Sequence, residues 1–265
     1  MAEATANVEE VVEQRVKPWQ FKWLGGMIVK PRATLTAIRA VDRSIWLMPI
    51  LIILALLTLR VIVNAPLRLA ALEQGAPVID PNNQQFLTPE QQAQMQQALE
   101  ATKGPVFLYV FPIAGALMSG LILWSMTAAL LHLFSTLQGG RGTLTRALNL
   151  VAWGSVPAMI HLLVQIIYAA TTNKLIAEPG LAGFAAQPPD GSVVVHALLS
   201  RIDLYLFWHM ALLLIGVKIF TNIRTRKALT AVLVTFIIVL AVRILPDVVG
   251  ASLGGLTVSQ PFPFF

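Results

Sequence analysis

The sequence predicts an all-α membrane protein, a polytopic helical bundle with five transmembrane helices. Of its 265 residues, 56% are hydrophobic and 12% are charged, about half the charged fraction of a typical soluble domain. The apolar residues fall into long blocks, and the block at residues 105–137 contains no Asp, Glu, Lys or Arg. A helix rises about 1.5 Å per residue and the hydrocarbon layer is about 30 Å thick, so about 20 residues are enough to cross it.

Two segments precede the first predicted span. Residues 1–16 carry Glu3, Glu9, Glu10 and Glu13 and are expected to form a flexible acidic tail, without the apolar core of a cleaved signal peptide. Residues 17–44 interleave aromatic and basic side chains, which is typical of the membrane interface, where rings lie among headgroups and cations meet anionic lipid. We expect this segment to contact lipid headgroups or a partner through Trp19, Lys22, Trp23, Lys30 and Arg32.

Part of this interface segment, residues 31–41, is predicted to form a short helix. Its face with Leu35, Ile38 and Val41 is expected to contact lipid or protein. Nucleic acid would also attract an aromatic and basic patch of this kind. We favour the lipid surface because a membrane span begins directly afterwards, and basic segments beside a span are attracted to anionic leaflets.

The membrane domain is predicted at residues 45–250. Its five spans are expected at residues 45–63, 105–137, 147–171, 202–220 and 228–248. The first span should end at Asn64 and Pro66, because proline interrupts the hydrogen bonds of a helix. Pro105 and Pro112 favour an irregular first turn of the second span, and Gly115, Ser119 and Gly120 should allow a neighbouring helix to approach it closely. Residues 251–265 are expected to form an apolar tail at the outer interface.

The connections between the spans differ in character. The longest hydrophilic one contains Thr88-Pro89-Glu90-Gln91, which indicates the capped start of a Gln-rich helix ending near Thr102. That helix either rests on the outer surface or is a solvated spacer. The turn Gly139-Gly140-Arg141-Gly142-Thr143 should place Arg141 and Arg146 at headgroup phosphates, and a second basic turn contains Arg224, Arg226 and Lys227.

The basic residues predict the orientation of the bundle. With five spans, the N-terminal segment and the two basic turns lie on one side of the membrane and hold most of the Lys and Arg residues. The opposite side and its span ends hold fewer: Arg60, Arg68, Lys103, Lys174, Arg201 and Arg243. Because cytoplasmic loops are enriched in Lys and Arg, we expect a multi-pass protein of the cell membrane with a cytoplasmic N-terminus and a C-terminus outside.

Several motifs together resemble the Yip1 domain family, in its prokaryotic branch, over residues 20–250. They are Ile28-Val29-Lys30-Pro31-Arg32-Ala33-Thr34-Leu35 before Trp46 and Pro49, the 139–143 turn, Trp153-Gly154-Ser155-Val156-Pro157, and Ile202-Asp203-Leu204-Tyr205-Leu206-Phe207-Trp208 with Gly216 beyond it. The resemblance implies the five-span architecture. Eukaryotic relatives carry an N-terminal Asp-Leu-Gly-Pro-type motif and contact prenylated Rab GTPases in vesicle traffic. No such motif precedes Trp19, so the resemblance does not imply a GTPase partner for this chain.

Charged and polar groups inside the spans are the candidate site residues, because burying them in a membrane is costly. Asp203, Arg60 and Arg243 lie at comparable depth, and we expect an intramembrane ion pair between Asp203 and one of the arginines. Arg201 and Asp247 are alternative partners at the interface. In the third span a polar stripe recurs every fourth residue. It comprises Asn149, Trp153, Pro157, His161 and Gln165. Its polar side chains Asn149, His161 and Gln165 either form hydrogen bonds between helices or line a polar path through the bundle.

Other classes of site have little support in the sequence. The chain has no cysteine, which excludes disulfides and thiol chemistry. His132, His161, His196 and His209 show no metal-ligand spacing, the glycine turn lacks the Gly-Lys-Ser/Thr of a phosphate loop, and no catalytic motif is present. We therefore expect no catalytic residues, no metal and no cofactor.

The sequence favours a non-enzymatic protein that organises or escorts other membrane components through its cytosolic face. Its expected partners are the lipid bilayer and other membrane proteins, not nucleic acid, and a homo-oligomer is possible. The alternative is a small transporter or channel subunit that uses Asp203, Arg60 and Arg243, with a wet cavity at the midplane in place of a dry, small-residue bundle. An enzyme acting on lipids is the least favoured hypothesis.

Overall fold

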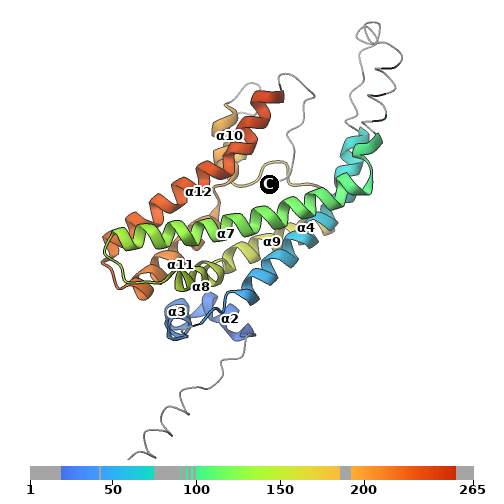
Figure 1. Ribbon diagram of the computed structural model, residues 1–265. Helices are drawn as coiled ribbons and strands as arrows, with labels where there is room; N and C mark the ends of the chain where they lie inside the picture. Colours follow the sequence, from blue (N-terminus) through green and yellow to red (C-terminus); the bar gives the residue numbers. More distant parts are fainter. Residues whose placement is uncertain are drawn as a thin grey trace, which may run out of the picture.

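A computed structural model describes residues 19–41, 43–74, 100–185 and 192–254, with the isolated positions 90, 94 and 97. Regular structure in these residues is helical throughout (Figure 1). The elements are α2 (Phe21–Val29), α3 (Pro31–Ala40), α4 (Leu47–Gln74), the π-helical turn η1 (Val106–Val110), α7 (Phe111–Leu137), α8 (Leu144–Gly154), α9 (Val156–Thr172), the 3-10 turn η2 (Ala182–Phe184), α10 (Val193–Ser200), α11 (Leu204–Thr221) and α12 (Thr225–Gly254). The predicted acidic tail, most of the predicted helix at 88–102, and residues 255–265 of the apolar tail lie outside the described residues.

The described residues contain five segments that are long and apolar enough to cross a membrane. They are Leu47–Glu73, Val106–Leu137, Leu144–Thr172, Leu204–Thr221 and Thr225–Gly250. This confirms the predicted all-α, five-span bundle. The shortest segment, α11, has 18 residues and is therefore about 27 Å long. Its first residue must lie near one boundary of the hydrocarbon layer, and its last residue near the other.

The predicted end of the first span at Asn64 and Pro66 is wrong. Helix α4 continues through Pro66 to Gln74. Proline removes one hydrogen bond from a helix, but a membrane helix tolerates this loss where neighbouring helices hold it in place. Here α4 packs along α9 and η1, and Ala65, the residue before the proline, is buried.

The second span begins irregularly, as its prolines predicted. The Phe111 amide donates to the Val106 carbonyl oxygen five residues earlier, which is the bond of a π-helical turn. Pro112 then lies in the first turn of α7, directly after this irregular turn, and has no N–H to continue the hydrogen bonds of the helix. Further along α7, a Cβ atom at Gly120 would lie 2.9 Å from Leu57 Cδ1, so this glycine lets α4 approach closely.

The third span was predicted as one helix and is instead two, α8 and α9, which meet at Ser155. Pro157 lies in the first turn of α9 and has no N–H for the Trp153 carbonyl. The Ser155 hydroxyl donates to the Val151 carbonyl oxygen at 2.7 Å. The predicted polar stripe is therefore divided between the two helices: Asn149 and Trp153 are buried in α8, whereas His161 and Gln165 lie half-buried on α9.

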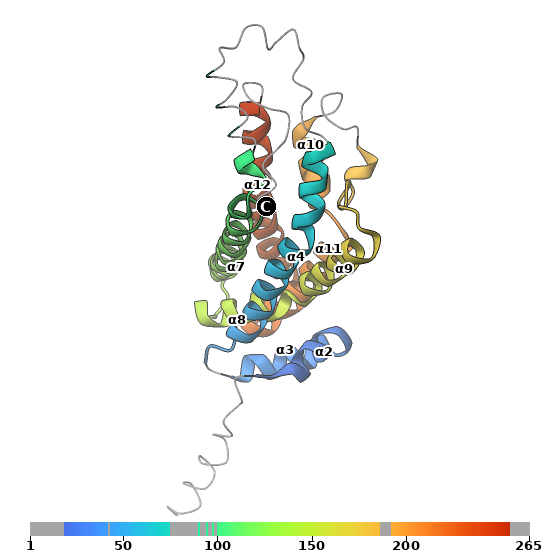
Figure 2. The same ribbon diagram turned by 90° about the vertical axis from the view of Figure 1, so that its right-hand side faces the viewer.

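Helices α2 and α3 lie across one end of the bundle, which we call the α2–α3 end (Figure 2). Leu35 and Ile38 on α3 are fully buried, and α3 packs against α11 and α8. The ring of Trp23 meets the ring of Trp153 edge to face, with 5.3 Å between centroids. The interface segment predicted for residues 17–44 thus shares one core with the membrane helices, and the α3 face with Leu35 and Ile38 contacts protein.

The link between α3 and α4 is fastened to α8 by hydrogen bonds. Asn149 Oδ1 accepts from the Ile45 amide and Asn149 Nδ2 donates to the Arg43 carbonyl oxygen, each at 2.9 Å. Trp153 Nε1 donates to the Ile45 carbonyl oxygen at 3.1 Å. These three bonds fix the position of α2 and α3 relative to the bundle.

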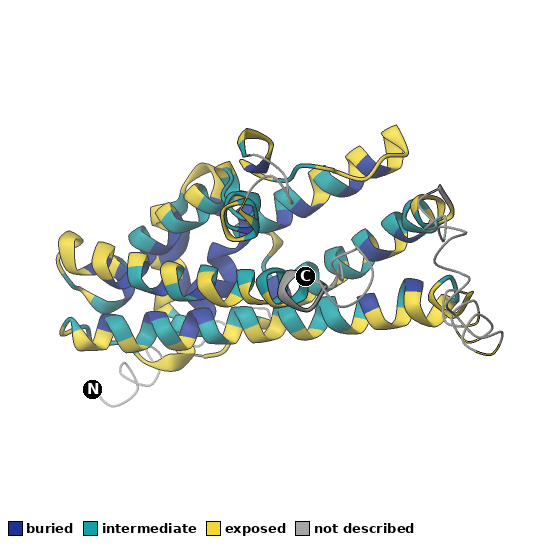
Figure 3. Cartoon of the chain, turned by 90° about the horizontal axis from the view of Figure 1, so that it is seen from above, coloured by how far each residue is buried: buried dark blue, intermediate teal, exposed yellow. Residues whose placement is uncertain are grey.

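Close packing at the centre depends on glycine. A Cβ atom added at Gly216 of α11 would collide with Leu150 Cδ1 of α8, and one at Gly154 would lie 2.8 Å from Leu213 Cδ2. The two helices therefore cross at a distance that only glycine permits at these positions. In Figure 3 the buried residues line the inward faces of the helices, and the exposed ones lie on the outer faces.

Candidate functional site

Two regions carry the polar residues singled out by the sequence. One lies toward the end of the bundle that holds α10, which we call the α10 end. The other is the α2–α3 end, where the turn at 138–143 and the turn at 222–224 also lie, since α7 and α11 end there (Figure 1).

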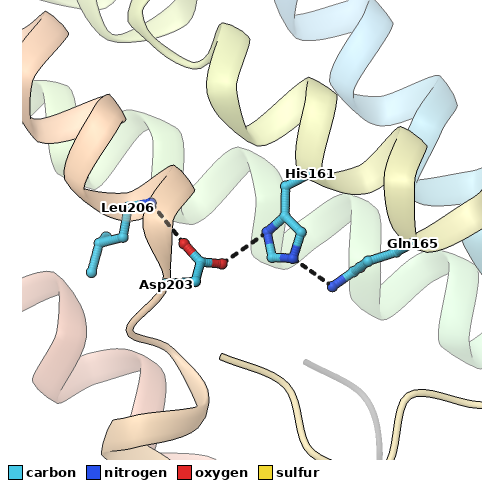
Figure 4. A network of polar contacts seen from close by, with 4 residues as sticks. All are labelled: His161, Gln165, Asp203 and Leu206. Carbon is cyan, nitrogen blue, oxygen red and sulfur yellow. Dashed lines mark hydrogen bonds and ion pairs between the residues drawn. The ribbon is translucent and has the colours of Figure 1, made fainter. Parts of the chain in front are cut away.

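At the α10 end, Asp203 caps the first turn of α11. Its Oδ1 accepts from the Leu206 amide at 2.7 Å, and its Oδ2 lies 3.1 Å from His161 Nδ1 (Figure 4). His161 Nε2 lies 2.8 Å from Gln165 Nε2. Because an amide nitrogen only donates, His161 accepts at Nε2 and carries its proton on Nδ1, facing the carboxylate. The His161 ring also stacks on Tyr205 at 4.7 Å. The network therefore joins α9 to the start of α11.

The direct ion pair expected between Asp203 and Arg60 or Arg243 is not formed among the described residues. The carboxylate of Asp203 is occupied by the Leu206 amide and by His161. The second carboxylate at this end, Asp247, accepts from Arg201 Nη2 at 2.9 Å. Arg201 and Asp247 were expected as alternative partners of the intramembrane charges, and in the structure they pair with each other. The contact of His161 with Asp203 was not expected, because the two residues lie on different spans.

Arg60 and Arg243 nevertheless lie in the same region. The charge of Arg60 interacts with those of Arg68, Arg201 and Arg243. Arg243 is also within electrostatic range of Asp203 and Asp247. Arg60 on α4 and Arg243 on α12 thus lie within electrostatic range of each other and of Arg201, the residue after α10.

The polar stripe predicted along the third span does not form one path. The side-chain oxygen and nitrogen of Asn149 both form hydrogen bonds with the α3–α4 link, at the α2–α3 end. His161 and Gln165 belong to the Asp203 network. The two groups serve separate contacts, and the break at Ser155 divides them.

At the α2–α3 end the two basic turns contact each other. The Arg141 amide donates to the Thr221 carbonyl oxygen at 3.3 Å, and Lys227 Nζ donates to the Gln138 carbonyl oxygen at 2.8 Å. Gly139 adopts a positive φ of 88°, which the tight turn requires and glycine provides without strain. The side chains of Arg141, Arg224 and Arg226 are exposed beside these contacts. Both turns therefore present their cations on one surface.

A cavity of about 200 Å³ opens next to this surface. It is lined by Val41, Arg43, Thr143, Thr145, Arg146 and Asn149. Thr143 caps α8 by accepting from the Arg146 amide at 3.3 Å. Arg43 was not among the expected contact residues, and its approach to Arg146 could not be predicted because about 100 positions separate them in the sequence. Its position directly before the first span was the available signal.

The expected headgroup contacts on α2 divide into two kinds. Trp19 and Phe21 are exposed and stack on each other at 6.3 Å, and Lys22, Lys30 and Arg32 are also exposed. Trp23 instead packs against the buried Trp153. Trp23 is half-buried, and the buried part of its ring packs on the core beneath α8. Its contact with lipid or a partner stays a prediction.

Within the described residues, no three His, Asp or Glu side chains gather where they could hold a metal ion. Comparison with known proteins gives one match: the model of the Yip1 domain fits residues 25–245. That range includes most of α2, all of α3 and the five membrane-spanning segments up to the last turns of α12. No curated protein and no solved structure matches the chain.

Proposed function

Because the chain belongs to the Yip1 domain family and is a multi-pass membrane protein, we propose that it organises or escorts other membrane components and is not an enzyme. The working surface in this proposal is the α2–α3 end. The observation that carries it is the pair of bonds from Arg141 to Thr221 and from Lys227 to Gln138, which join the two basic turns into one surface.

The packing of the bundle supports this function over that of a carrier. A carrier needs polar groups that face water near the midplane. In the described residues, six polar residues are buried almost completely, and the side chain of each is bonded to the backbone. These side chains are Thr34, Thr127, Ser135, Asn149, Ser155 and Thr235. Polar side chains whose hydrogen bonds are made to the backbone stabilise the helices and the α3–α4 link, and they are not free to bind a transported solute.

The distribution of charge supports a cytosolic location for the α2–α3 end. The basic residues of α2, α3 and the two turns gather there, and cytoplasmic faces of membrane proteins are enriched in Lys and Arg. In this proposal the protein lies in the cell membrane with its N-terminus in the cytoplasm and its C-terminus outside. Partners would approach from the cytoplasm.

The exposed side chains of α2 suit contact with another membrane protein at the headgroup level. The exposed fraction is 63% for Phe21 and 74% for Val29, with Lys22 and Lys30 beside them. Apolar side chains next to cations match a partner that presents both apolar and acidic side chains close to the membrane surface. A second copy of the chain is one such candidate.

Site-specific photo-crosslinking in intact cells tests the proposal. A photoreactive residue at Arg226 or Val29 is expected to capture other membrane proteins, whereas one at Lys174, exposed at the α10 end, should capture few. Reversing the charge of Arg141 and Arg224 should reduce capture from Val29 without changing the thermal unfolding temperature. Equal capture at Lys174, or capture of nothing but lipid at all three positions, would reject the function.

A further inference from the structure

Four arginines lie toward the α10 end, and we call Arg60, Arg68, Arg201 and Arg243 the arginine cluster. The charge of Arg60 interacts with those of Arg68, Arg201 and Arg243, and the charge of Arg243 also interacts with that of Arg201. Two carboxylates lie among them. Asp247 pairs with Arg201, and Asp203 bonds to His161 and to the start of α11. Neither carboxylate pairs directly with Arg60 or Arg243 in the described structure.

Arg60 and Arg243 both lie inside membrane-spanning segments, on α4 and α12. They are half-buried, so their guanidinium groups are neither sealed in the core nor free in bulk water. A guanidinium inside a membrane is costly unless an anion or a hydrogen-bond acceptor compensates it. Two such groups near each other repel, which raises that cost further. An anion held between them would remove both penalties.

An unpaired polar atom beside Arg60 on α4 indicates that a ligand completes this region. Asn64 lies one helical turn from Arg60 and one turn from Arg68, so the three residues share one face of α4. Asn64 Oδ1 is buried and has no hydrogen-bond partner in the structure. Buried polar atoms in native proteins are almost always satisfied, so such atoms suggest a bound polar molecule.

The chemistry of these groups selects the ligand. Guanidinium groups bind phosphate and carboxylate oxygens through paired N–H donors, and they favour such planar recognition over contact with a simple halide. Asn64 Oδ1 in addition requires a donor, which a hydroxyl group on the ligand can supply. A phosphate that carries or adjoins a hydroxyl satisfies both requirements.

We propose that Arg60 and Arg243 bind a phosphate group at the α10 end of the bundle, with Asn64 accepting a hydrogen bond from a hydroxyl of the same ligand. The phosphate belongs either to the headgroup of a phospholipid in the adjacent leaflet or to a free ion. This site lies at the opposite end from the proposed docking surface and does not depend on it.

The first test uses the full-length protein purified in a neutral, phospholipid-free detergent. Inorganic phosphate is expected to raise the thermal unfolding temperature of the wild type above that in chloride at equal ionic strength. The double variant Arg60→Gln/Arg243→Gln should lose this rise. Its unfolding temperature without phosphate should be higher than that of the wild type, because the repulsion between the two guanidinium groups is gone. The matched control is Arg39→Gln, which removes an exposed arginine from α3 and should behave as the wild type.

The second test separates the two sources of phosphate. Protein reconstituted in nanodiscs of phosphatidylcholine with phosphatidylglycerol is released into the mass spectrometer, and the phospholipids that remain bound are counted. A lipid site predicts phosphatidylglycerol retained by the wild type and by Arg39→Gln but not by the double variant. A site for free phosphate predicts the response in detergent with no difference in retained lipid.

Three results would overturn the proposal. The first is a wild type that responds to neither inorganic phosphate nor phosphatidylglycerol. The second is a double variant that keeps the full response of the wild type, which would show that the arginines do not bind the phosphate. A double variant that unfolds at a lower temperature without ligand would likewise overturn the proposal, because it would show that the arginines stabilise the fold. If the double variant cannot be purified, the single variants Arg60→Lys and Arg243→Lys replace it. They keep the charge but lose the paired donors, and each should weaken the response.

Discussion

Lys227 Nζ lies 2.8 Å from the carbonyl oxygen of Gln138, 89 positions earlier in the chain. The bond crosses from the first turn of α12 to the end of α7 and joins the two basic turns. Lys227 therefore differs from its neighbour Arg226, which is exposed and for which no bond to the other turn is found. Lys227 was expected to contact lipid headgroups, and in the structure its side chain also connects the two basic turns.

Lys227→Met should lower the stability of the protein. The substitution keeps the length of the side chain but removes the donor to Gln138, at a cost of roughly 1 kcal/mol because the contact is exposed. Arg226→Met removes one charge from the same turn without breaking that bond, and should change the unfolding temperature little. The measurement is thermal unfolding in detergent, and equal losses in the two variants would show that the bond contributes nothing.

Asn149→Leu should loosen the α2–α3 end. The leucine has the same branching and number of side-chain heavy atoms but cannot accept from the buried Ile45 amide or donate to the Arg43 carbonyl oxygen. An unpaired buried amide costs about 1–3 kcal/mol. Limited proteolysis should then cleave near residues 43–46 faster than in the wild type. Trp153→Phe, which loses one bond to Ile45, should increase the cleavage rate by less. An unchanged cleavage rate in both variants would show that these bonds do not hold the α3–α4 link on α8.

Gly216→Ala should destabilise the crossing of α8 and α11. The added methyl group would collide with Leu150, and overpacking of this kind costs roughly 1–3 kcal/mol. The double variant with Leu150→Ala should recover part of the loss because space is opened for the methyl group. Gly250→Ala is the matched control, since a Cβ atom there meets nothing within 4 Å. If Gly216→Ala is as stable as Gly250→Ala, the helices do not depend on glycine for their approach.

Asp203 performs two tasks that substitutions can separate. Asp203→Asn keeps an oxygen that can cap α11, whereas Asp203→Ala loses both the cap and the contact with His161. The alanine variant should therefore be less stable than the asparagine variant by about 1 kcal/mol. Thermal unfolding measures the difference. A double-mutant cycle with His161→Gln then gives the energy of the contact, and complete additivity would mean that Asp203 and His161 do not interact.

The pair of Arg201 and Asp247 predicts a rescue. The side chains are 16% and 30% exposed, so Asp247→Asn should cost more than the roughly 1 kcal/mol of an exposed pair and less than the roughly 3 kcal/mol of a fully buried one. Neutralising Arg201 as well, in Arg201→Gln/Asp247→Asn, should restore part of the stability because no uncompensated charge remains. A double variant that is less stable than Asp247→Asn would contradict this account.

The prolines show how far local sequence can predict structure. Pro66, Pro112 and Pro157 each remove one backbone donor. Pro112 lies in the first turn of α7, as predicted, and Pro157 begins α9 and divides the third span. Pro66 lies within α4, which continues for two more turns. The residue is the same in each case, and the outcome depends on which helices pack beside it.

The sequence by itself determined the all-α class, the five spans and the approximate position of each, because the length and apolarity of a segment are local properties that the bilayer selects. It also identified Arg60 and Arg243 as charges within the spans, whereas Asp203 caps the start of α11 directly before its span. Only the tertiary structure decided which groups meet. Asp203 bonds to His161, Asp247 to Arg201, and Asn149 to the α3–α4 link. These partners come from separate helices, and their contacts depend on the rotation and depth of each helix, which close packing at Gly154 and Gly216 sets for α8 and α11.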